Sequence, residues 1–297
     1  MTAVTAEAQR PDLREPKGWR RTKNRTMTAL MVLSFILVII PLGFVLFTVI
    51  AKGASAISWS FLTGSIPPVV APVGVGGIGP AIVGTLEITA LATVIAVPLG
   101  ILGAVYLNEY GGKNPLAAFI GFMSDVMTGV PSIIMGLFIF TIWTLHFGLS
   151  GFGGALALAC LMLPIVIRSS EEMLKLVPNS LREASYALGA SKTRVTLTVV
   201  FPAALGGIVS GALLAVARGA GETAPLLFTI LTVTEANRNV FHGANTALAT
   251  QIFSNATQPY PGAEARAWGA ALTLIAIAFI LMVAARIVTA RFAHQAR

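Results

Sequence analysis

The chain has 297 residues, of which 56% are hydrophobic and only 11% are charged. Ordinary soluble domains contain roughly 45–50% apolar and about 25% charged residues, so this composition excludes an ordinary water-soluble fold. The formal net charge is +8. In a soluble protein that excess would suit a nucleic-acid partner, but no folded module or interleaved aromatic residues accompany the basic residues, which argues against one.

Apolar runs dominate the chain. A helix that crosses a bilayer core of about 30 Å needs roughly 20 apolar residues. Six candidate runs occur, at residues 27–50, 80–107, 116–146, 152–167, 203–233 and 268–288. We therefore predict an all-α polytopic membrane protein of about six transmembrane helices. Its single membrane domain spans residues 27–290, between polar tails at 1–26 and 291–297.

The basic residues predict the orientation of these helices. Seven Lys and Arg residues precede the first run, five lie from Arg168 to Arg194, and three follow residue 285. If the helices alternate across the membrane, all these segments lie on one side, which the positive-inside rule makes the cytoplasm. Both termini are then cytoplasmic. The tail before residue 27 is too polar and too long for a cleaved signal peptide, so we expect the first run to remain as an anchor.

The second and third runs carry two acids whose positions need an explanation. The helix of the second run is expected to close at Gly111-Gly112, since glycines can adopt the positive φ that ends a helix.

The run 116–146 is longer than one span, and we divide it into an interfacial stretch and a membrane helix from about residue 126. Asp125 then need not be buried, and we expect Glu87 to lie near the outer interface for the same reason.

A polar loop of residues 168–200 separates the fourth and fifth runs. Ser180 and Glu183 have the spacing of a capping box, which predicts a helix start. Gly189 permits a sharp turn, and a second short helix is expected near Ser191. The first helix would carry an apolar stripe, made of Leu181, Ala184, Ala187 and Leu188. Such a face needs a partner surface, although burial against the chain's own membrane domain is an alternative.

The same loop resembles a known motif. Glu183-Ala184-Ser185, Gly189 and the Val199-to-Pro202 segment keep the spacing E-A-A, three residues, G, nine residues, I-x-L-P. This is similar to the EAA loop of permease subunits of binding-protein-dependent ABC importers, with Ser in place of the third alanine and Val and Phe in place of I and L. The resemblance implies a MetI-like fold. It also implies a coupling loop over residues 168–202 in which Glu183, Ala184, Ser185 and Gly189 dock a separate ATPase.

Further segments are similar to the phosphate permeases of this family: residues 76–85, 95–100, 106–110, 130–138 and 218–229. The resemblance covers roughly residues 27–290. It implies a bacterial plasma-membrane location and a heterodimer with a similar permease, together with two copies of an ATPase and an external phosphate-binding protein. The chain has no G-x-x-x-x-G-K-[ST] loop, so we expect it to be no enzyme and to carry no cofactor, with ATP and Mg²⁺ bound by the partner ATPase.

The fifth run contains two charges, Arg218 and Glu222. A charged residue in the middle of a membrane helix costs about 2.5–3.5 kcal/mol to insert even on the lenient scale, so it needs a partner. The four-residue spacing lets these two side chains pair on one helical face, which also suits a purely structural ion pair. Our hypothesis is that Arg218 contacts phosphate transiently, with Glu222 as its counter-charge and Thr223 as an extra donor.

Arg168, at the inner end of the fourth run, is the second basic candidate. It either attracts phosphate to the cytoplasmic exit or extends to the interface as a topology signal. The alternative functions are a permease for another oxyanion, such as sulfate or molybdate, and a self-sufficient secondary transporter. An intramembrane enzyme is more distant, and the three scattered histidines predict no metal site.

Overall fold

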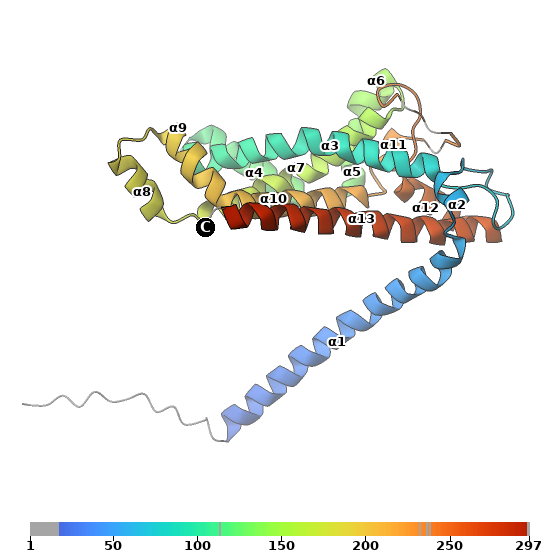
Figure 1. Cartoon of the computed structure of the whole chain (residues 1–297), viewed down its shortest axis with the longest axis horizontal. Helices are drawn as coiled ribbons and strands as arrows, with labels where there is room; N and C mark the ends of the chain where they lie inside the picture. Colours follow the sequence, from blue (N-terminus) through green and yellow to red (C-terminus); the bar gives the residue numbers. More distant parts are fainter. Residues whose placement is uncertain (1–17, 113, 232, 236, 238, 296–297) are drawn as a thin grey trace, which may run out of the picture. The chain divides into compact units, whose positions relative to one another are not determined.

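The computed structural model describes residues 18–112, 114–231, 233–235, 237 and 239–295. Every regular element in this part of the chain is a helix, which confirms the all-α prediction (Figure 1). The chain divides into two units, Met1–Thr48 and Val49–Arg297. The described part of the first unit is most of helix α1, Trp19–Gly53. Residues 1–17 of the predicted N-terminal tail lie outside the described residues, and α1 begins within the rest of that tail.

Several helices of the second unit are long and apolar enough to cross a membrane. They are α3 (Gly79–Val105) continued by the π-helix η2 (Tyr106–Tyr110), α7 (Gly151–Lys175), the continuous stretch α9 (Lys192–Val195), η4 (Thr196–Val200) and α10 (Phe201–Ala220), and α13 (Pro261–Gln295). A further pair, α4 (Pro115–Gly129) and α5 (Ser132–Ile139) with η3 (Phe140–Thr144) and α6 (Leu145–Phe147), is bent by 111°. With α1, the described residues hold five membrane spans, or six if the bent pair counts as one.

Shorter helices connect these spans. They are η1 (Ala54–Ala56), α2 (Trp59–Thr63), α8 (Asn179–Ala187), α11 (Leu226–Thr229) and α12 (Leu248–Ala256). Figure 1 shows α8 and α9 together at one end of the bundle and α2 and α12 at the other. The predicted C-terminal tail is not separate, because α13 continues to Gln295.

Three predicted boundaries are wrong. The fifth span occupies Lys192–Ala220 rather than 203–233. It begins after the Ser191 cap, and it ends where the Gly221 N–H donates to the carbonyl of Arg218. The fourth extends to Lys175, because Glu171 and Lys175 pair along the helix and stabilise a polar last turn. The third breaks at Val130 and Pro131, not near residue 126, since proline disfavours a helical conformation in the residue before it.

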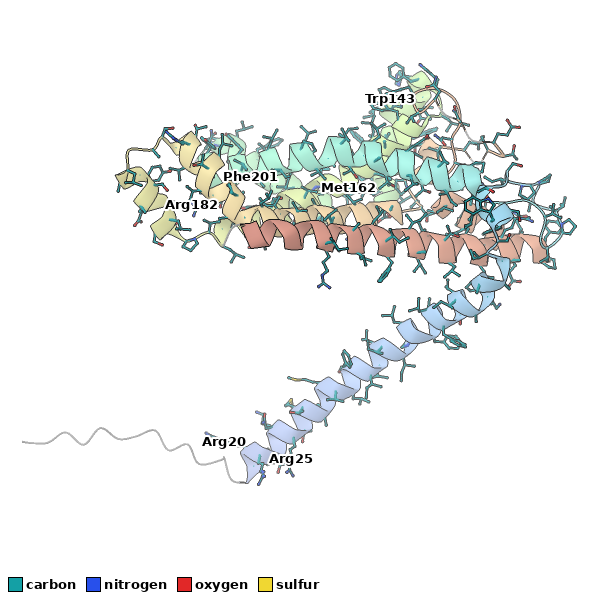
Figure 2. The ribbon with its side chains drawn as sticks, in the orientation of Figure 1. Arg20, Arg25, Trp143, Met162, Arg182 and Phe201 are labelled. Carbon is teal, nitrogen blue, oxygen red and sulfur yellow. The ribbon has the colours of Figure 1, made fainter. Side chains whose placement is uncertain are left out.

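The core of the second unit forms where α3 packs against α7 through small side chains. Buried alanines line both helices at this contact: Ala92, Ala96, Ala155 and Ala159. A Cβ on Gly100 would lie 2.7 Å from the Cβ of Val166, so only glycine allows the two backbones this close. Lipid is as apolar as the side chains, so close packing and polar contacts rather than a hydrophobic driving force hold such helices together. Met162, labelled in Figure 2, lies in the same core.

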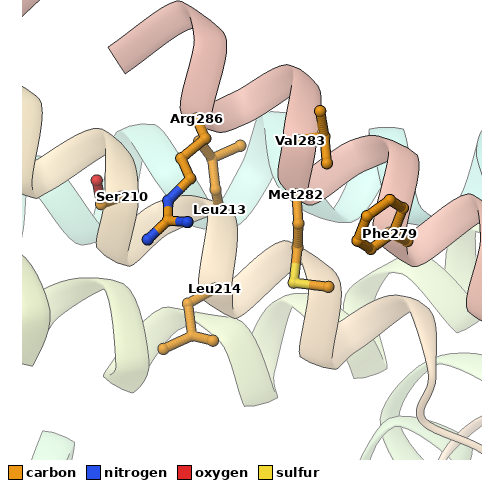
Figure 3. A pocket seen from close by; sticks show the side chains of 7 residues that line it. All are labelled: Ser210, Leu213, Leu214, Phe279, Met282, Val283 and Arg286. Carbon is orange, nitrogen blue, oxygen red and sulfur yellow. The ribbon is translucent and has the colours of Figure 1, made fainter. Parts of the chain in front are cut away.

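A groove of about 510 Å³ runs between α10 and α13 (Figure 3). Leucine, phenylalanine, methionine and valine side chains line most of it, and Ser210 and Arg286 supply the polar groups. An apolar groove on a membrane helix pair is compatible with lipid chains or with another apolar helix, so it needs no aqueous ligand.

Replacing Gly100 with alanine is expected to lower the free energy of unfolding by about 1–3 kcal/mol, because the new methyl group overpacks against Val166. Thermal unfolding of the purified chain in detergent measures the change. Gly103→Ala is the matched control on the same helix, since its Cβ would meet Ile167 at an ordinary 3.4 Å. Equal stability of the two variants would contradict the proposed close contact.

Candidate functional site

Arg218 and Glu222 lie at the end of a helix. Arg218 is in the last turn of α10, and Glu222 follows in the turn after Ala220. The Arg218 Nε lies 3.7 Å from the Glu222 Oε1, which confirms the predicted pairing. This distance is an ion pair without a close hydrogen bond. The Arg218 side chain is 69% exposed and that of Glu222 21% exposed, so the guanidinium keeps donors available to another acceptor.

The position of Arg218 corrects the expectation of a mid-helix residue. The backbone N–H groups of Gly221 and Glu222 donate to the carbonyls of Arg218 and Gly219 at 3.1 Å, which closes α10 with a turn. A cation is favourable in this last turn, where the helix dipole is negative. Both the Glu222 carboxylate and the negative end of the α10 dipole therefore lower the free energy of placing the Arg218 charge in a membrane helix.

Two glycines let neighbouring helices approach this break. A Cβ on Gly219 would lie 3.0 Å from the Met162 Sδ in α7. On α5, a Cβ on Gly136 would lie 2.5 Å from the Cα of Pro225. The chain after α10 is thus held closely by two other helices. Thr223 lies in this segment, half-buried, and its carbonyl accepts the N–H groups of Leu226 and Leu227; its role as a donor through the hydroxyl stays a prediction.

Arg168 is more engaged than the sequence suggested. Its guanidinium pairs with Asp125 of α4 and with Glu171 of α7, the latter at 2.6 Å, and donates to the carbonyl of Gly121 at 2.8 Å. The side chain is about two-thirds buried and joins α4 to α7. Asp125 is exposed, as expected, and it forms an ion pair with Arg168. Arg168 also lines a cavity of about 310 Å³, next to Glu171 and Gly121.

Helix α8 presents the predicted coupling residues to the surroundings. Glu183 and Ala184 are exposed, and the Ser185 hydroxyl donates to the carbonyl of Leu181. Gly189 has φ +81°, which confirms the predicted sharp turn. The Ser191 hydroxyl accepts the N–H of Arg194, which confirms the start of the second helix.

One expectation about this loop is wrong, and one alternative is excluded. The residue before α8 is Pro178, and no side chain caps the helix, so Ser180 and Glu183 form no capping box. The apolar stripe is not covered by the chain's own membrane domain, since none of the α8 residues, all of which the structure describes, is buried. Leu188, just after α8, is 89% exposed.

Sequence reasoning missed the contact that holds α8. The Arg182 Nη2 donates to the Glu109 Oε1 at 2.8 Å, and the two side chains are 15% and 6% exposed. A buried charge needs a charged or hydrogen-bonded partner. Glu109 at the end of an apolar run was the available signal, although its partner lies 73 residues away.

Other polar groups lie apart from these sites. Glu87 in α3 is half-buried, and its Oε2 has no hydrogen-bond partner among the described residues. Within the same part of the chain, no three His, Cys, Asp or Glu side chains lie together as metal ligands would. The described contacts do not join Arg168 to the Arg218 pair.

The described residues thus form a bundle of helices long and apolar enough to cross a membrane, with a two-helix loop exposed at one end. The family model described as "Binding-protein-dependent transport system inner membrane component" matches residues 96–294. The chain therefore belongs to this family, whose members are permease components rather than enzymes.

Curated relatives support a narrower similarity. The chain is 45% identical over 272 residues to "Phosphate transport system permease protein PstA 1" of Mycobacterium tuberculosis (strain CDC 1551 / Oshkosh), which covers 91% of this chain and 89% of the relative. It is 41% identical over 288 residues to "Phosphate transport system permease protein PstA" of Yersinia pestis, which covers 95% of each.

Solved structures agree on the fold. The chain superposes on a chain of the inward-facing MetNI methionine ABC transporter with a TM-score of 0.58 and 19% identity, covering 73% of this chain and 94% of that one. A chain of a bacterial alginate ABC transporter, in complex with an alginate-bound periplasmic protein, gives a TM-score of 0.64 at 13% identity, covering 93% and 98%. These likenesses confirm the predicted ABC importer permease fold.

Replacing Glu171 with glutamine is expected to lower the free energy of unfolding by about 1.5–3 kcal/mol, because this buried carboxylate accepts from both Arg168 and Lys175. Asp125→Asn is expected to cost only about 0–1 kcal/mol, since Asp125 is 67% exposed. Thermal unfolding in detergent compares them, with the exposed Glu172→Gln as control. A larger loss at Asp125 than at Glu171 would contradict this ranking.

Proposed function

We propose that this chain is the permease subunit of an ATP-driven phosphate importer and forms half of its translocation pathway. The observation that carries the proposal is the similarity, over at least nine-tenths of the chain, to phosphate permeases at 41–45% identity. The exposed α8 supports it, because a permease without its own ATPase needs a surface on which one can act. The alternatives of a sulfate or molybdate permease and of a secondary transporter have no such support.

The proposed assembly has four kinds of subunit. A PstC-like permease completes the pathway, a PstB-like ATPase dimer binds ATP and Mg²⁺, and a PstS-like protein delivers phosphate from outside. In the proposed topology, both termini and the coupling loop 168–202 are cytoplasmic in the bacterial plasma membrane. This topology rests on the lopsided distribution of basic residues and on α8 and α9 lying together at one end of the bundle (Figure 1).

Arg218 is the proposed phosphate contact. A phosphate group carries about −1.5 to −2 charges at pH 7, so it crosses hydrocarbon only where donors and positive charge line its path. The exposed guanidinium of Arg218 offers both, in a planar geometry that binds oxyanions through two N–H groups. Glu222, held 3.7 Å away, competes with the anion for this cation and favours its release. Thr223 adds a hydroxyl donor in the same turn.

Arg168 is a second proposed contact, with a condition that the geometry imposes. Asp125 and Glu171 already neutralise its charge. An anion can therefore bind there only as the more exposed Asp125 moves away, which makes this pair suited to the cytoplasmic exit. Arg168 then contacts phosphate only in conformations in which α4 and α7 have separated at this point.

In proteoliposomes that contain the whole complex, we expect phosphate uptake that requires ATP and that excess sulfate does not reduce. Arg218→Gln is expected to lower the uptake rate at least about 100-fold, since a hydrogen bond to a charged group contributes about 1.5–3 kcal/mol and a bidentate contact makes two. Radiolabelled phosphate uptake measures both results. Arg218→Lys, which keeps the charge without the planar fork, is the matched control and is expected to retain partial activity.

Uptake by this chain alone without ATP would establish a secondary transporter instead. Wild-type uptake by an Arg218→Gln complex that assembles normally would remove Arg218 from the pathway. Strong competition by sulfate would favour the broader oxyanion permease.

The coupling proposal concerns the exposed part of α8. Glu183, Ala184, Ser185 and Gly189 are proposed to dock the ATPase, and Glu183→Lys is expected to reduce co-purification of the ATPase at least about tenfold by placing a repulsive charge in the interface. Quantified pull-down of the tagged chain measures it. Glu172→Lys, an equally large charge change on the exposed side of α7, is the control; equal losses in both variants would contradict docking through α8.

A further inference from the structure

Helix α8 has an unusual attachment to the rest of the protein. The segments on either side of it are anchored in a buried cluster, through Val177 before it and Val195 after it. The helix itself has no buried residue. Buried residues therefore hold its flanks, while the contacts of the helix itself with the membrane helices are made by polar groups.

Arg182 makes those contacts. Its Nη1 donates to the carbonyl of Val177 at 2.8 Å, and its Nη2 donates to the carbonyl of Leu174 at 3.1 Å. Both acceptors lie at the carboxyl end of α7, where helix carbonyls lack intrahelical partners. The same Nη2 reaches Glu109 at the end of α3 at 2.8 Å. One guanidinium thus joins the coupling helix to the ends of α3 and α7, the two helices that form the core.

A second side chain also holds the Glu109 carboxylate in place. It lies in the π-helix η2, which is a continuation of α3, and the Asn108 side chain donates to the same Oε1 at 2.7 Å. The neighbouring Tyr110 faces the second short helix of the loop, where its hydroxyl donates to the Thr193 hydroxyl at 3.3 Å. The end of α3 therefore contacts both helices of the coupling loop.

A turn bounds α8 at each end. Pro178 precedes the helix, and Gly189 with φ +81° follows it. These two turns separate the short helix from α7 and α9, so that Arg182 is its charged link to the ends of α3 and α7. A displacement of α8 relative to the bundle would change the distances from Arg182 to Glu109 and to the Leu174 carbonyl.

We propose that Arg182 and Glu109 are positioning residues that transmit movement of the ATPase-docking helix α8 to α3 and α7. The proposal rests on the proposed function, since it assumes that an ATPase moves α8. Glu183 and its neighbours are where force is received, whereas the Arg182–Glu109 pair is where the force enters the membrane helices. Loss of the pair uncouples hydrolysis from transport while the ATPase stays bound.

The test uses the complete importer in proteoliposomes and measures anion uptake per ATP hydrolysed, with ATPase co-purification in parallel. Glu109→Gln and Arg182→Gln are each expected to lower this ratio at least fivefold, with ATPase content within twofold of wild type. The double variant is expected to be no worse than Arg182→Gln alone, because the two residues act through one contact. Glu172→Gln is the control, as an exposed acid near the same end of the bundle.

An unchanged ratio in Glu109→Gln would overturn the proposal. Loss of ATPase content in proportion to uptake would also overturn it, since the pair would then merely support the fold. Independent, multiplying effects of the two substitutions would show that they do not act through each other. The proposed function fails separately, in the wild-type complex: if that complex takes up sulfate rather than phosphate, the same ratio is measured with sulfate and still tests the pair.

Discussion

Close packing between α3 and α7 is the constraint on which the rest of this protein depends. In a bilayer, apolar side chains gain little by leaving lipid for one another, so helices associate where backbones come near enough for dense contact and polar bonding. Gly100 and the facing alanines provide that approach. Because α3 and α7 are fixed relative to each other, Glu109 at the end of one and the carbonyls at the end of the other can receive the same guanidinium of Arg182.

The end of α10 follows the same logic with different residues. Glycines on α10 and α5 bring Met162 and Pro225 against the break, which makes an interrupted helix affordable only because neighbouring helices enclose it. The interruption leaves Arg218 in a last turn, beside Glu222 and largely exposed. A cation placed this way is held by the helix end and by an ion pair without a close hydrogen bond, which leaves its other N–H donors exposed.

Arg168 and Arg182, both in the segment 168–202, have different sets of partners. The terminal nitrogens of Arg168 contact two acids and a carbonyl on α4 and α7, whereas its Nε has no partner among the described residues. Arg182 has one acid and three further oxygen acceptors, on Val177, Leu174 and Asn179. The first pattern suits a closure between helices, and the second suits a link between a surface helix and the bundle.

The sequence by itself determined that the chain lies in a membrane, that it is all-helical and to which family it belongs. These follow from run lengths, composition and the spacing from Glu183 to Pro202, which are local properties of the chain. It also predicted the turn at Gly189 and the Arg218–Glu222 pair, because positive φ and four-residue spacing are local too. Only the tertiary structure decided where α10 ends, since the hydropathy of the sequence does not reveal a helix break that other helices enclose. The Arg182–Glu109 contact was likewise decided there, because residues 73 positions apart meet only once α3 and α7 have packed.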